Sequence, residues 1–98
     1  MSIRKEVEEF VALGPLPDES ASEALITEHQ VSLQRIKKPV ADEEAALLVK
    51  SFGSDDCYGL AWTLVHLIES APGGAGLMSK PTDADNEWVR RLWARSHR

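Results

Sequence analysis

Hydrophobic positions along this chain recur at the three- and four-residue spacing of amphipathic helices. No stretch shows the sustained alternation of a β-strand, and no hairpin turn dipeptide is present. The pattern predicts helices at about 3–13, 20–36, 42–52, 55–71 and 85–96. Connections of a few residues favour antiparallel neighbours. We therefore expect an all-α fold, a small antiparallel bundle of four to five helices.

Local signals support these helix ends. Ser20 and Glu23 have the spacing of a capping box, which would begin the second helix. Gly14-Pro15 follows the first predicted helix, Gly53 the third, and Pro72-Gly73-Gly74 the fourth. Ser54 or Asp55 is expected to cap the fourth helix. The residues 72–84 that come next are rich in glycine and lack periodicity, which predicts a mobile or binding loop.

The helix predicted at 55–71 contains the most apolar run of the chain. Its apolar side chains cover well over half of the helix circumference: Cys57, Leu60, Ala61, Leu64, Val65, Leu67, Ile68 and Ala71. A helix that is apolar over so much of its surface is normally surrounded by other helices. We therefore expect this helix to be central.

A narrow polar stripe remains on the same helix, formed by Gly59, Thr63, His66 and Ser70. Glycine inside a helix costs about 1 kcal/mol relative to alanine. Gly59 therefore predicts that a neighbouring helix approaches closely at Gly59 and Thr63. The stripe also supports an alternative function, a homo-oligomeric ligand- or metal-binding helical module.

The length and charge narrow the class of protein. Ninety-eight residues suit one helical domain over 1–98. The net charge is −5, and residues 1–89 carry −9 because 16 acidic residues there face 7 basic ones. The last nine residues contain four arginines, which give a basic tail. An acidic chain is a poor general binder of nucleic acids or anionic membranes, so we expect neither as a partner.

The sequence shows neither a signal core nor a membrane span, which predicts a cytoplasmic protein. The single cysteine cannot form an internal disulfide, and the charged N-terminus "MSIRKEVEEF" has no apolar signal core. The apolar run Leu60–Ile68 is interrupted by Thr63 and His66 and is far shorter than the roughly 20 residues of a membrane span.

Candidate catalytic chemistry is weak in this sequence. Cys57 follows Asp55 and Asp56, whose charges oppose formation of a thiolate, so we expect Cys57 to be a core residue and the two aspartates to cap the helix. No nucleophile elbow is present, and "GGAG" at 73–76 lacks the lysine and hydroxyl residue of a phosphate loop. We therefore expect no enzyme activity and no cofactor.

Histidines provide the remaining candidates for a metal site. The apolar stripe of the second helix consists of Leu25, Ile26, Leu33 and Ile36. His29 lies in the middle of this stripe, where it is expected to pack with one nitrogen hydrogen-bonded. His29 and His66 could approach each other and join Asp56 or Glu69 around an ion. No spacing typical of metal ligands supports that arrangement, and we expect no metal.

The last predicted helix has a sharp division of side chains. Trp88, Val89, Leu92 and Trp93 occupy one arc and the arginines occupy the other. Tryptophan and arginine are enriched at binding hot spots. The candidate interaction residues are Asp55, Asp56, Trp62, His66, Trp88, Trp93, Arg91 and Arg95.

The block "DEEAALLVKSFGSDDCYGLAWTLVHLIESAPG" resembles small uncharacterised bacterial all-helical proteins. The resemblance covers about a third of the chain and implies a helical fold without implying catalytic residues.

The combined pattern predicts a non-catalytic protein-binding helical domain. Its acidic body would accelerate association with a basic partner, as in an immunity-type protein that neutralises one. The partner is expected to be another protein, and a second copy of the chain in a homodimer is the alternative.

Overall fold

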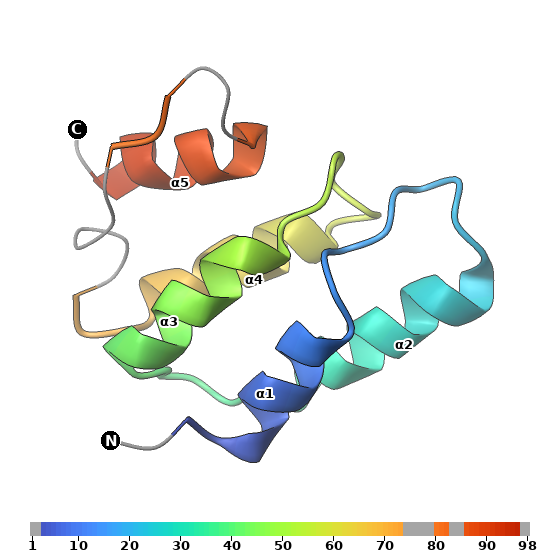
Figure 1. The fold of residues 1–98 in the computed structure, drawn as a ribbon, viewed down its shortest axis with the longest axis horizontal. Helices are drawn as coiled ribbons and strands as arrows, with labels where there is room; N and C mark the ends of the chain where they lie inside the picture. The colour runs from blue at the N-terminus through green and yellow to red at the C-terminus, as the bar shows by residue number, and fades with distance from the viewer. Residues whose placement is uncertain (1–2, 74–79, 83–85, 97–98) are drawn as a thin grey trace.

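The computed structural model describes residues 3–73, 80–82 and 86–96. This part of the chain is helical and contains no strand, which confirms the all-α prediction. The elements are α1 (Lys5–Ala12), α2 (Glu23–Gln34), α3 (Asp42–Leu48), the short 3-10 helix η1 (Val49–Ser51), α4 (Leu60–Glu69) and α5 (Glu87–Ser96) (Figure 1).

The helices form two antiparallel pairs and one further helix. Figure 1 shows α3 and α4 side by side in the middle, with α1 and α2 on one side and α5 on the other. The molecule is flat, with principal extents of 36 × 32 × 17 Å. Its radius of gyration of 12.7 Å is close to the roughly 13 Å expected for a compact chain of this length.

The central helix is α4, as predicted. Six of its ten residues are buried: Leu60, Ala61, Leu64, Val65, Leu67 and Ile68. Leu64 and Ile68 are fully inaccessible to solvent. Burying one such side chain contributes about 1.5–3 kcal/mol to the free energy of folding. The packing of α4 is therefore a main source of stability.

The beginning of α4 differs from the prediction. Cys57, Tyr58 and Gly59 have positive φ angles of 49°, 54° and 92°, so the helix begins at Leu60 and Gly59 is its N-cap residue. A Cβ on Gly59 would meet no atom within 4 Å. The predicted close helix contact at Gly59 is therefore wrong, and the left-handed backbone explains the glycine instead.

The predicted capping box at the start of the second helix is also wrong. Ser20 bonds to Asp18, whose Oδ1 accepts hydrogen bonds from both the backbone N and the hydroxyl of Ser20. The helix begins at Glu23 with Ser22 as N-cap, and Ser22 Oγ accepts from Leu25 N at 3.2 Å. The expected first helix is confirmed as α1, and the expected third helix comprises α3 followed by η1.

A close backbone contact occurs at Gly53. A Cβ there would lie 2.0 Å from the carbonyl oxygen of Leu16. Leu16 N also donates to Ser51 O at 2.8 Å. The connector between α1 and α2 therefore packs against the end of η1 at a position that only glycine allows.

Trp88 attaches α5 to the rest of the molecule. Its side chain is buried, with its ring 6.4 Å from Phe52 in a stacked arrangement and 5.2 Å from Trp62 edge-on. Asn86 begins the helix, because its Oδ1 accepts from Trp88 N at 2.7 Å and its Nδ2 donates to Gly53 O at 2.7 Å. The predicted loop falls largely on residues 74–79 and 83–84, and Asp85 also lies outside the described residues.

In the ranges that the structure describes, no helix has both the length and the apolar character needed to cross a membrane.

Candidate functional site

Five of the predicted interaction residues lie together where α4 meets α5. The ring of Trp62 is 6.2 Å from His66 and 5.2 Å from Trp88. Arg91 lies 4.8 Å over the ring of Trp88, and Arg95 lies 5.6 Å over the ring of Trp62. The contact between Arg95 and Trp62 joins α5 to α4, whereas Arg91 and Trp88 both belong to α5.

Both arginines also have carboxylate partners within the chain. Arg95 donates from Nε and Nη2 to Glu69 at 2.8 and 3.1 Å, a bidentate pair that raises the pKa of Arg95. Arg91 lies 3.4 Å from Glu87, one turn away on α5. The sixth residue, Trp93, is half-buried and has Lys80 5.6 Å from its ring. The Arg95–Glu69 pair therefore attaches α5 to α4, whereas the Arg91–Glu87 pair lies within α5.

The two remaining predicted residues, Asp55 and Asp56, belong to the turn before α4. Asp55 Oδ1 accepts from Cys57 N at 2.9 Å, and Asp55 Oδ2 accepts from Glu19 N at 3.0 Å. Asp56 is partly buried, and its Oδ1 has no hydrogen-bond partner among the described residues. Asp55 therefore joins this turn to the α1–α2 connector instead of capping a helix.

Cys57 is fully buried, as predicted. Burial raises the pKa of its thiol, and the negative charges of Asp55 and Glu19 raise it further. This environment disfavours the thiolate that a nucleophilic cysteine requires.

The histidines occupy different environments. His29 is buried on α2, with Nδ1 3.0 Å from Leu25 O and its ring edge-on to Phe10 at 6.3 Å. The carbonyl can only accept, so Nδ1 carries the proton in this contact. His66 is exposed on α4. Within the described ranges, no three His, Cys, Asp or Glu side chains come together in a group suited to a metal ion.

The hydroxyl groups of the polar stripe on α4 bond mainly to their own helix. Thr63 Oγ1 donates to Gly59 O at 3.2 Å. Ser70 Oγ donates to Leu67 O and accepts from Val40 N at 3.2 Å. Thr63 and His66 are exposed, so this part of the stripe lies on the solvent side of α4.

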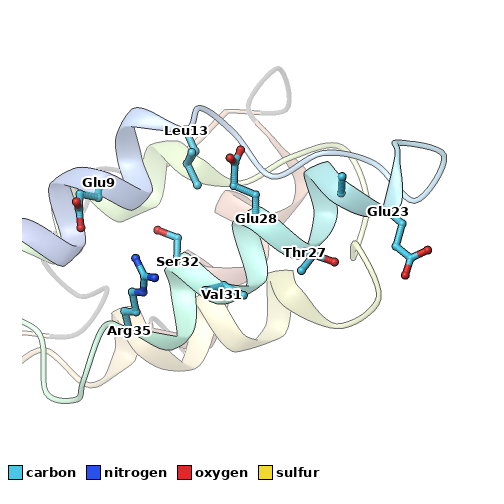
Figure 2. A pocket seen from close by; sticks show the side chains of 9 residues that line it. Glu9, Leu13, Glu23, Thr27, Glu28, Val31, Ser32 and Arg35 are labelled. Carbon is cyan, nitrogen blue, oxygen red and sulfur yellow. The ribbon is translucent and has the colours of Figure 1, made fainter.

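A groove between α1 and α2 was missed by the sequence reasoning (Figure 2). Its volume is about 890 Å³, and residues from both helices and from Leu13 just after α1 line it. The lining side chains are the apolar Leu13, Ala24 and Val31, the acidic Glu9, Glu23 and Glu28, and Thr27, Ser32 and Arg35.

Exposed apolar side chains gather around α2. The large hydrophobic residues exposed in the described ranges are Leu25 (40%), Val31 (42%) and Tyr58 (68%). Leu25 and Val31 belong to α2, and Tyr58 lines a second, smaller hollow with Ile26 of the same helix. Leu25 was expected in the buried stripe, which is wrong.

The sequence contained one signal for this surface. Apolar residues occur on several sides of the second helix, including Val31 outside its expected stripe. A single buried face cannot accommodate all of them.

No protein-family profile matches this chain, and neither a curated protein nor a solved structure gives a significant match.

Proposed function

We propose that this protein binds a basic protein partner without catalysing a reaction, through the surface around α2. The observation that carries the proposal is that two exposed apolar side chains, Val31 and Tyr58, line neighbouring hollows that share Glu23 and Thr27 of α2. Exposed apolar groups that gather on one part of a surface are typical of protein-binding sites. In the described ranges, the large apolar side chains that remain exposed on a helix are Leu25 and Val31, and both belong to α2.

The charge of the same surface indicates the kind of partner. Glu9, Glu23 and Glu28 line the groove, and Glu19 lies beside Tyr58. The net charge of −5 would steer a basic protein toward the molecule and increase its association rate. An immunity-type protein that occupies and neutralises a basic partner in the cytoplasm fits this combination.

The other candidate residues are less suited to an external partner. Arg91 and Arg95 are paired with Glu87 and Glu69, and Trp88 is buried between α5 and the rest of the molecule. A partner that used these residues would have to replace contacts that hold α5 in place. The proposal therefore assigns the Trp/Arg cluster a structural role.

The test begins with affinity capture from the native host and identification of the captured proteins. Each is purified alone, and its dissociation constant is measured at several salt concentrations. We expect a basic partner whose binding weakens as salt increases, because screening reduces attraction between exposed charges. The proposal would be contradicted if none of the captured proteins binds again after purification, or if binding does not depend on salt.

A further inference from the structure

We infer that the groove between α1 and α2 binds one amphipathic, basic helix of the partner. This inference rests on the proposed function and specifies its docking site. Figure 2 shows side chains from both helices bordering the groove, with Leu13 near α1 and Val31 on α2. Two antiparallel helices with an apolar strip between them form the type of groove in which an amphipathic helix docks.

The dimensions of the groove suit a short helix. Lining residues extend along α2 from Glu23 to Arg35, a distance of about 18 Å at the rise of an α-helix. A partner helix of about three turns spans this length. Apolar side chains on one face of that helix would contact Val31 and Leu13.

The charges of the groove favour a basic occupant. In the described ranges, the carboxylates of Glu9, Glu23 and Glu28 have no ion pair or hydrogen bond, whereas those of Glu44 and Glu69 pair with arginines. Their carboxylates are therefore available to lysine or arginine side chains of another molecule. An acidic helix would meet repulsion from all three.

The charge is also asymmetric along the groove. Figure 2 shows Glu9 and Arg35 at one end, whereas Glu23 lies at the other with Glu28 between them. The positive charge of Arg35 offsets one carboxylate at its own end. The partner helix should therefore place most of its basic residues beside Glu23 and Glu28, which sets the direction in which it docks.

The test uses synthetic peptides and nuclear magnetic resonance of the labelled full chain. The main probe is a three-turn amphipathic helix with leucines on one face and lysines on its flanks. One control peptide replaces the lysines with glutamates, and another replaces the leucines with serines. We expect only the main probe to shift the amide signals of Leu13, Thr27 and Val31 in a saturable manner.

Matched protein variants separate the groove from the net charge. The double variant E23Q/E28Q removes two carboxylates from the groove. The control variant E8Q/E43Q removes two exposed carboxylates that do not line it. We expect E23Q/E28Q to weaken peptide binding about fivefold, because exposed charge pairs each contribute only modestly to a binding free energy. The control should stay close to the unmodified protein.

Several results would overturn the inference. Equal weakening by the two double variants would show that only net charge matters. Shifts restricted to the turn at Tyr58 would place a basic ligand elsewhere on the surface around α2 and leave the proposed function intact. Shifts restricted to α5 would contradict both this inference and the proposed function. Absence of any shift with the main probe would exclude the groove as a general basic-helix site. Groove signals that move on dilution, together with a dimer in sedimentation, would identify a second copy as the occupant.

Discussion

Arg4 and Glu44 form a buried-carboxylate pair across 40 positions of sequence. Glu44 is 2% exposed, and its carboxylate accepts from Arg4 N and Nε at 3.0 Å and from Arg4 Nη2 at 3.2 Å. It also accepts a hydrogen bond from Ala41 N at 2.8 Å, so the backbone N–H of the N-cap residue of α3 has a partner. The pair joins the start of α1 to the start of α3. The hydrogen bonds from Arg4 are the main reason that the pKa of Glu44 falls from 4.5 to about 2.

This pair predicts a specific loss of stability in acid. Because the folded-state pKa is lowered, the stabilisation is complete above about pH 4.5 and disappears as the pH falls toward 2. The shift corresponds to about 2–3 kcal/mol of folding free energy, allowing for the partial exposure of Arg4.

Chemical unfolding of Glu44→Gln as a function of pH provides the measurement. We expect this variant to be less stable at pH 7 and to lose less stability than the unmodified protein between pH 5 and pH 3. Glu43→Gln, which changes the exposed neighbour, is the matched control. Parallel pH profiles for the unmodified protein and Glu44→Gln would contradict this assignment.

Gly53→Ala should destabilise the fold through a backbone clash. The new methyl group would lie 2.0 Å from the carbonyl oxygen of Leu16, so the connector between α1 and α2 must move. We expect a cost of about 2 kcal/mol or more in urea unfolding, at the upper part of the range for overpacked sites. Ser54→Ala, at the exposed next position, should change stability little. A neutral Gly53→Ala variant would be incompatible with the described packing.

Gly59 should behave differently, because its backbone conformation and not its surroundings requires glycine. Gly59→Ala and Gly59→Leu should each cost about 1–2 kcal/mol, since both force a side chain into the left-handed region. The two costs should be similar because no atom lies within 4 Å of the Cβ position. Thermal unfolding can compare them. A much larger cost for leucine would instead support the prediction from the sequence that a neighbouring helix lies close to Gly59.

Cys57 should react slowly with thiol reagents in the folded protein. Its side chain is fully buried, and its raised pKa reduces the fraction present as thiolate. We expect dithiobis(nitrobenzoate) to modify one thiol rapidly in guanidinium and only slowly without it. Rapid stoichiometric reaction of the native protein would show that the turn before α4 is open to solvent.

Periodicity was sufficient to predict the helices and the central position of α4. The apolar residues Leu60, Leu64 and Ile68 lie on its buried surface as expected. The beginning of α4 could not be predicted in the same way. Cys57 and Tyr58 adopt positive φ angles, although neither residue type favours that conformation. Contacts of the turn with Glu19 and Asp55 accompany this conformation.

The candidate site was harder to predict than the fold. The α4–α5 residues Trp62, Trp88 and Arg95 were selected for their chemical types, and the structure brings them together. Their pairing with Glu69 depends on how two distant helices pack, which local spacing does not reveal. The groove was missed for the same reason, because its walls come from α1 and α2 together.

The central claim is that α4 supplies the buried core and that α2 carries apolar surface left for a partner. Equilibrium unfolding of Leu64→Ala and Val31→Ala tests it most directly. We expect Leu64→Ala to lower the unfolding free energy by about 2–5 kcal/mol, and Val31→Ala to lower it by less than about 1 kcal/mol. Equal costs, or a larger cost at Val31, would contradict the claim.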